Sequence, residues 1–174
     1  KQHLFRAGEI YETILEKNES AVDVYNSILD IDIDDIEALG RLEALYLRME
    51  RWDDLQNIYQ RKTDLVDTIE EKKELLYVMG AVYEREVDDT EKAIDTYQRV
   101  LELDPDDALG NFGLGELLVE EGRYGEAVSH LERALTADPR YSAALLALGR
   151  AHEGANDAAA ARDTYRRGVD IAAA

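Results

Sequence analysis

The feature that most constrains the fold of this 174-residue chain is an internal repeat of 34 residues. Its two prolines, Pro105 and Pro139, lie 34 residues apart, and each follows an aspartate at the end of an apolar segment, in LELDPDD and LTADPRY. Three further pairs keep this offset: Leu114 and Leu148, Gly115 and Gly149, Ala127 and Ala161. A fixed period of about 20–50 residues indicates a solenoid, in which each unit buries its apolar face against its neighbours.

The first half of the chain carries the same pattern at an offset of 72 residues, the length of two repeats. Gly8, Tyr11, Ala21, Asp23, Tyr25, Leu29 and Asp32 correspond to Gly80, Tyr83, Ala93, Asp95, Tyr97, Leu101 and Asp104, and Leu42, Trp52 and Leu55 correspond to Leu114, Tyr124 and Ala127. The distances from Gly8 to Ala21 and from Gly80 to Ala93 are one residue longer than that from Gly115 to Ala127. We expect this extra residue to alter the local pitch of the array.

The segment LDIDIDDIEALG, residues 29–40, raises the question of a calcium loop, because EF-hands place aspartates at alternate positions. Counted from Asp30, however, the sixth position is Asp35 where that loop needs glycine, and the twelfth is Arg41 where it needs a bidentate glutamate. The 72-residue offset instead aligns LDIDIDD with LELDPDD, the end of one repeat. We therefore predict that Asp34 or Asp35 caps the helix that follows.

The segments LGELLVEEGRYGEAVSHLERALTADP and LGRAHEGANDAAAARDTYRRGVD resemble the tetratricopeptide repeat (TPR), a helix–turn–helix unit of about 34 residues. The resemblance implies an all-α, right-handed α-solenoid of five repeats and about ten helices over residues 1–174. The repeats are expected at about 1–35, 36–72, 73–107, 108–141 and 142–174. Repeat two is longer and has no Asp-Pro stop, so we expect its second helix to be extended by about half a turn to a turn.

Amino-acid usage changes within the array. Residues 1–105 hold six lysines and nine isoleucines, whereas residues 106–174 hold no lysine and one isoleucine, Ile171. This change is consistent with drift among repeats, or with a chimeric or engineered array joined near 104–110. Finding the whole stretch in one natural open reading frame would refute the fusion.

The net charge of −19 argues against nucleic acid as a partner, since a polyanion would be repelled. If the partner is charged, the same balance favours a basic one. The chain has no apolar run of about 20 residues and no signal peptide, which predicts a soluble, cytoplasmic protein without membrane insertion. There is no cysteine, so disulfides and thiolate metal sites are excluded.

No catalytic constellation is evident. His3, His130 and His152 belong to different repeats and do not form the i, i+4 pair of a helical zinc site. The segment GNFGLG, residues 110–115, lies within an expected helix without a preceding strand, so it does not indicate a phosphate loop. We expect no enzymatic activity, no metal and no cofactor.

In the TPR family the first helix of each repeat forms the concave wall, which implies a peptide-binding groove here. The groove candidates carried over from the family positions are Phe5, Glu9, Glu12, Glu37, Arg48, Glu74, Tyr77, Glu84, Arg85, Phe112, Glu116, Glu120, Leu146 and Arg150. They form an apolar-aromatic stripe flanked mainly by glutamates, suited to a protein or peptide segment with apolar anchors and some Lys or Arg. The alternative to peptide binding is that Phe5, Tyr77 and Phe112 only pack against adjacent helices.

Family members that hold a chaperone's C-terminal carboxylate use lysines and asparagines on this wall. Here Glu, Ala, Phe or Tyr stand at those positions, which argues against that activity. The chain begins with Lys1 and ends GVDIAAA after the fifth repeat. If the terminal repeats are uncapped, Tyr165 and Val169 border an open face, and a self-assembling, homo-oligomeric module becomes the alternative function.

Overall fold

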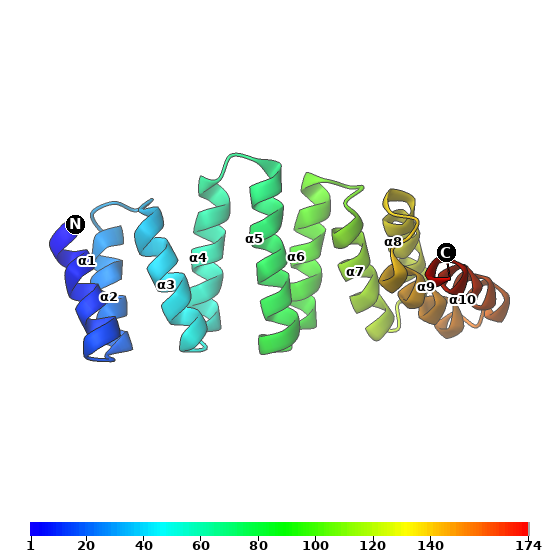
Figure 1. Cartoon of the computed structure of the whole chain (residues 1–174), viewed down its shortest axis with the longest axis horizontal. Helices are drawn as coiled ribbons and strands as arrows, with labels where there is room; N and C mark the ends of the chain where they lie inside the picture. The colour runs from blue at the N-terminus through cyan, green and yellow to red at the C-terminus, as the bar shows by residue number, and fades with distance from the viewer. Residues whose placement is uncertain (174) are drawn as a thin grey trace. The chain divides into compact units, whose positions relative to one another are not determined.

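The computed structural model describes residues 1–173 and is all-α, as expected from the sequence. Within this range the chain forms ten α-helices and two π-helical segments and no strand (Figure 1). The elements are α1 (Gln2–Glu9), η1 (Ile10–Ile14), α2 (Asn18–Leu29), α3 (Ile36–Arg48), α4 (Trp52–Leu65), α5 (Ile69–Val82), η2 (Tyr83–Val87), α6 (Thr90–Leu103), α7 (Ala108–Glu120), α8 (Tyr124–Ala137), α9 (Ser142–Gly154) and α10 (Ala158–Ala172). The chain divides inside α5 into two compact units, unit 1 from Lys1 to Leu75 and unit 2 from Leu76 onward.

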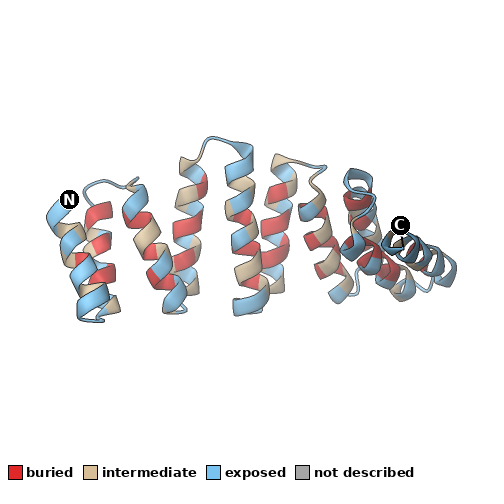
Figure 2. Cartoon of the chain, viewed as in Figure 1, coloured by how far each residue is buried: buried red, intermediate tan, exposed pale blue. Residues whose placement is uncertain are grey.

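Unit 1 is a stack of consecutive helices. Helix α1 packs on α2, α2 on α3 and α3 on α4. Figure 2 shows buried residues along these helices, with exposed residues on their other sides. Large side chains that are fully buried form the core: Tyr25, Ile28, Leu39, Leu42, Leu45 and Leu55. The apolar spacing of each helix therefore forms one stripe that meets its neighbours, as in an amphipathic helix.

Unit 2 repeats this arrangement with smaller side chains. Helix α6 packs on α7, α7 on α8, α8 on α9 and α9 on α10. Leucine and alanine dominate its core: Leu114, Leu118, Leu131, Leu145, Ala127, Ala134, Ala144 and Ala147. Burial of such apolar surface contributes most of the stability of a helical array.

The π-helical segments accommodate the extra residue of repeats one and three. Segment η1 lies between Gly8 and Ala21, and η2 lies between Gly80 and Ala93. In a π-helix the backbone bonds span five residues instead of four, so one more residue fits before the helix ends. The amide of Leu15 accordingly donates to the carbonyl of Ile10 at 3.0 Å. The extra residue is thus taken up inside the first helix of each of these two repeats.

Each turn inside a repeat contains one residue in the left-handed region. These residues are Glu16, Glu50, Asp88, Gly122 and Asn156, with φ between 51° and 73°. Four of the five carry a side chain, which a left-handed backbone disfavours by about 1–2 kcal/mol. Gly122 is the one position where this turn is made without that steric cost.

Aspartates cap two of the helices that begin a repeat, α3 and α7. Asp35 accepts a hydrogen bond from the amide of Ala38 at 2.8 Å, and Asp107, 72 residues on, accepts from Gly110 at 2.7 Å. The predicted cap is therefore confirmed at Asp35. The Lys1 ammonium lies 2.7 Å from Asp32 and 2.5 Å from Asp35, so these two carboxylates are held by a lysine.

The predicted extension of the second helix of repeat two is wrong. Helix α4 has 14 residues, as have α6 and α8, and ends at Leu65. The added residues lie in the connection to α5, where Val66 is extended. Thr68 begins the next helix, since its hydroxyl oxygen accepts from the amide of Glu71 at 3.2 Å and donates to the Glu71 carboxylate at 2.6 Å. This Thr-x-x-Glu pattern is a helix start signal, and it fixes where α5 begins.

Tyrosine rings from the second helix of a repeat lie against glycines of the first helix. A Cβ added to Gly8 would lie 2.6 Å from Cε1 of Tyr25, and one added to Gly149 would lie 2.1 Å from Cε1 of Tyr165. A Cβ added to Gly80 would lie 3.1 Å from Cζ of Tyr97. The glycines thus make room for an aromatic ring within the same repeat. Tyr97 also lies against Gly113, so this ring fills space between neighbouring repeats.

Candidate functional site

In unit 1 the predicted groove residues form a network of paired charges. Glu9 is the last residue of α1, Glu12 lies three residues later in η1, and Arg48 lies on α3. The Arg48 guanidinium is 3.3 Å from the carboxylate of Glu12, and Arg41 is 2.8 Å from that of Glu9. The hydroxyl of Tyr25 donates to Glu12 at 3.3 Å. The acidic wall of unit 1 is therefore matched by arginines of the chain itself.

Not every candidate in unit 1 joins this network. Glu37 and Glu74 are exposed, and the ring of Phe5 lies 6.1 Å from that of Tyr25, half-buried against it. Arg41 was not among the sequence candidates, because the family positions carried over do not include it.

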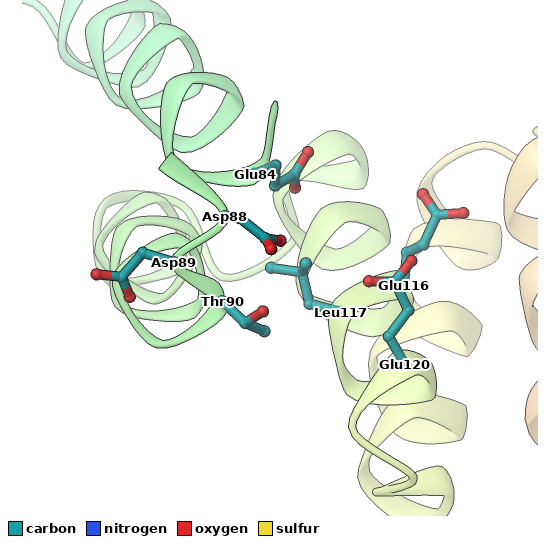
Figure 3. Close-up of a pocket in the computed structure, with 7 residues that line it drawn as sticks. All are labelled: Glu84, Asp88, Asp89, Thr90, Glu116, Leu117 and Glu120. Carbon is teal, nitrogen blue, oxygen red and sulfur yellow. The ribbon is translucent and has the colours of Figure 1, made fainter. Parts of the chain in front are cut away.

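In unit 2 the structure brings three of the predicted glutamates to one pocket. Its volume is about 150 Å³, and it is lined by Glu84, Asp88, Asp89, Thr90, Glu116, Leu117 and Glu120 (Figure 3). Glu84 lies in η2, whereas Glu116 and Glu120 lie one turn apart on α7 and so share a face. Asp88 and Asp89 come from the turn between η2 and α6, where Asp88 adopts the left-handed conformation. We name this site the acidic pocket.

The carboxylates of the acidic pocket influence one another. Burial raises the pKa of Glu84, and the nearby charges of Glu116 and Glu120 raise it further, while a hydrogen bond from Tyr97 and the charge of Arg85 oppose this. A raised pKa means that the negative charge of Glu84 is poorly compensated. A cation entering the pocket would relieve this condition.

Two basic residues of unit 2, Arg150 and Lys92, pair with carboxylates that line the acidic pocket. Arg150, on α9, lies 2.8 Å from the carboxylate of Glu116. Asp89 caps α6 by accepting from the amide of Lys92 at 3.0 Å and also pairs with the Lys92 ammonium at 3.5 Å. In Figure 3 the side chain of Asp88 points toward Leu117, and that of Asp89 points away from it. The exposed Arg85 is not a lining residue.

The aromatic candidates of unit 2 are half-buried and engaged in packing. The hydroxyl of Tyr77 donates to the carboxylate of Asp107, the residue that caps α7. The ring centroids of Phe112 and Tyr141 are 4.8 Å apart. Leu146, on α9, is 56% exposed and remains an open apolar position.

The two terminal-face candidates differ in their surroundings. The ring of Tyr165 lies against Gly149, and its hydroxyl donates to Glu153 at 3.0 Å. Val169 on α10 is 67% exposed. Tyr165 is therefore part of the internal packing, whereas Val169 is available to a partner.

Among residues 1–173, no three or more His, Asp or Glu side chains are grouped so that they could hold a metal ion. His130 is used internally: its Nδ1 lies 3.0 Å from Oδ1 of Asn111, whose amide donates to the carbonyls of Pro105 and Asp107. None of the helices described is long and apolar enough to cross a bilayer. The arrangement offers a surface for binding.

Comparisons with known proteins agree with this architecture. Among curated proteins, BBSome complex member BBS4 of Bos taurus is 29% identical over 137 residues, which are 78% of this chain and 25% of the bovine protein. The TPR repeat-containing protein PA0015 of Pseudomonas aeruginosa is 38% identical over 80 residues, 46% of this chain and 76% of that protein. The chain thus spans about a quarter of the length of the bovine relative.

A similar solved structure is YrrB, described as a TPR protein with an unusual peptide-binding site. It superposes with a TM-score of 0.66 at 20% identity, covering 97% of this chain and 84% of YrrB. Sequence models described as Tetratricopeptide repeat match residues 38–73, 78–140 and 118–174. Since these matches cover most of the sequence, the chain belongs to the tetratricopeptide repeat family.

Proposed function

We propose that this chain is a protein-interaction scaffold and that the acidic pocket of unit 2 receives a Lys or Arg side chain of a bound peptide. Tetratricopeptide repeats typically serve as scaffolds without catalytic activity, and the solved relative YrrB has a peptide-binding site. The pocket volume of about 150 Å³ equals that of roughly five water molecules, enough for one cationic head group.

The observation that carries this proposal is a comparison of the pocket with its own counterpart in unit 1. At the 72-residue offset, Glu84 corresponds to Glu12 and Glu120 corresponds to Arg48. In unit 1 Arg48 lies 3.3 Å from Glu12, so the chain supplies the cation that this carboxylate needs. In unit 2 a glutamate stands at that position. A cation for Glu84 is then best supplied by a ligand.

The remaining lining residues strengthen the contrast. Asp89 corresponds to Lys17, and Glu116 corresponds to Ala44. The pocket of unit 2 therefore holds five carboxylates where the equivalent positions of unit 1 hold two carboxylates and two cations. Half-buried Phe112 and exposed Leu146 on neighbouring helices provide apolar positions for flanking residues of the peptide.

The test is to supply the missing cation from the chain itself. Glu120→Arg should pair with Glu84 as Arg48 pairs with Glu12, and so fill the pocket. Binding of fluorescein-labelled peptides that combine one or two Lys or Arg residues with Phe or Leu, measured by anisotropy, should weaken at least tenfold.

The matched control is Glu121→Arg, which makes the same charge change at the exposed neighbouring residue. It should change the affinity by no more than about twofold, the small effect typical of an exposed charge. Equal affinities of wild type and Glu120→Arg, or equal losses in both variants, would reject the pocket as the binding site.

Self-association through α10 is the second candidate, and the exposure of Val169 favours it. Absolute mass measured by light scattering over about a hundredfold dilution should then exceed 19.7 kDa and fall to that value in Val169→Asp. A monomeric wild type at every concentration would exclude this candidate.

A further inference from the structure

The connection between α2 and α3 in unit 1 carries three highly exposed isoleucines. Ile31, Ile33 and Ile36 are 64%, 59% and 73% exposed, and they lie within six residues of one another. Single exposed aliphatic residues are common on protein surfaces, but a group of them on one turn indicates an interaction site. This is the segment whose alternate aspartates do not form a calcium loop.

The fold does not require isoleucine at these positions, because the same turn occurs twice more without it. The positions equivalent to Ile31, Ile33 and Ile36 are Leu103, Pro105 and Ala108, and then Ala137, Pro139 and Ser142. The backbone bond that closes the turn is alike in each case: Asp35 to Asp32 at 3.2 Å, Asp107 to Asp104 at 3.1 Å and Tyr141 to Asp138 at 3.1 Å. The isoleucines are therefore an addition to a turn that forms with proline and small residues.

Acidic side chains flank the isoleucines. Asp32 and Asp35 are paired with Lys1, but Asp30, Asp34 and Glu37 are exposed and form no ion pair within residues 1–173. A fourth isoleucine, Ile69, is 46% exposed at the start of α5, and the α4–α5 connection lies at the same edge of unit 1 as the α2–α3 connection (Figure 1). The surface is thus aliphatic with an acidic border.

We propose that this isoleucine turn docks an amphipathic helix of another protein, with an aliphatic stripe bordered by Lys or Arg. The exposed isoleucines supply apolar contact, and Asp30, Asp34 and Glu37 favour a basic border on the partner. The same carboxylates disfavour anionic lipid and nucleic acid. This surface is in unit 1 and does not depend on the acidic pocket.

The test uses a fluorescein-labelled peptide of about 18 residues, built of Leu and Lys with Leu at i, i+3, i+4 and i+7. Isoleucine methyl NMR of the full chain should show peptide-dependent shifts at Ile31, Ile33 and Ile36 but not at Ile94 and Ile171. The same shifts are expected in a Glu84→Gln/Glu116→Gln/Glu120→Gln background, which separates this site from the acidic pocket.

Replacing the turn by its counterparts should remove binding without unfolding the protein. Ile31→Ala, Ile33→Pro and Ile36→Ala introduce residues found at equivalent positions, so circular dichroism should be unchanged, while affinity for the Leu/Lys peptide falls at least tenfold. The matched control removes three exposed aliphatic residues that belong to none of the candidate sites, Ile14→Ala, Val78→Ala and Leu109→Ala, and should keep the affinity at this site within about threefold of wild type.

Three outcomes would overturn the proposal. The first is an unchanged affinity in the turn variant. The second is equal binding of a Leu/Glu peptide, which would remove the basis for a basic partner. The third is a concentration-dependent shift of the Ile31, Ile33 and Ile36 methyl signals without peptide, which would show that the occupant is a second copy of this chain.

Discussion

Two glycines of unit 1 should respond in opposite directions to the same substitution. Gly8 lies at a point where an added Cβ would be 2.6 Å from Cε1 and 2.7 Å from Cζ of Tyr25. Tyr25 is fully buried, and the ring of Phe5 lies 6.1 Å from its own, so it has little freedom to move away. Gly40, in the middle of α3, has nothing within 4 Å of an added Cβ.

The magnitudes follow from two opposing effects. Replacing glycine by alanine inside a helix stabilises the folded state by about 1 kcal/mol at either site. At Gly8 a contact below 3.0 Å must be relieved, and overpacking of a filled core costs about 1–3 kcal/mol. A ring that shifts also weakens its hydrogen bond to Glu12, a further ~1 kcal/mol. Gly40→Ala should therefore raise the free energy of unfolding by about 1 kcal/mol, and Gly8→Ala should lower it by about 1–3 kcal/mol.

The single tryptophan provides the assay. Trp52 begins α4 in unit 1, so its fluorescence during urea unfolding reports on this unit. With a urea dependence of about 1–3 kcal/mol per molar, the midpoints of the two variants should separate by roughly 1 M or more. Equal upward shifts for both glycines would show that no ring lies against the α1 backbone, and the account of these small residues would be wrong.

Two further predictions concern a turn and a histidine. Glu50→Gly should raise the free energy of unfolding by about 0.5–1 kcal/mol, and Gly122→Ala should lower it by about 1 kcal/mol, because both residues are left-handed; thermal melts of both variants test this. Burial, aided by the charge of Arg133 and opposed by that of Glu126, lowers the pKa of His130 in the folded state below its ordinary value of 6.5. The unfolded chain therefore binds the proton more readily than the folded one. The stability that neutral His130 contributes is complete above about pH 7 and is lost as pH falls through the pKa of the folded state. His130→Gln should reduce the difference between unfolding free energies measured at about pH 7 and pH 5, and an unchanged difference would exclude His130 as its source.

Much of the fold is encoded in residue spacing and could be predicted from it. The 34- and 72-residue offsets fix the number of helices, and the longer Gly8–Ala21 and Gly80–Ala93 intervals coincide with the two π-helical segments. Asp35 caps its helix as expected. The predicted length of α4 is wrong because Thr68 and Glu71 begin the next helix, a start signal that is visible in the sequence.

The acidic pocket could be predicted only in part. Glu84, Glu116 and Glu120 were found because they occupy first-helix positions of the family wall. Asp88, Asp89 and Thr90 were missed, since they belong to the turn after that helix and to the start of α6, and only the folded backbone brings these residues beside α7. Packing of Tyr77 and Phe112 against adjacent helices was the alternative to a role in the groove, but the spacing did not identify Asp107 and Tyr141 as their partners.

The internal repeat separates residues that build the fold from residues that distinguish one surface from another. Pairs that agree at the 72-residue offset, such as Tyr25 with Tyr97 or Asp35 with Asp107, make the same contacts in both units: a ring against glycine, and a helix cap. A pair that differs cannot be explained by the common fold, because the other unit forms without it.

The replacement of Arg48 by Glu120 is such a difference, and it puts a further carboxylate at the acidic pocket where unit 1 has the arginine that pairs with Glu12. The replacement of Pro105 by Ile33 is another, and it adds an aliphatic surface to an ordinary turn. Both lie on the outside of repeats whose cores are alike. Recognition by this chain is therefore expected at the positions where its two units disagree, and substituting each residue by its counterpart is the most direct way to abolish binding while keeping the fold.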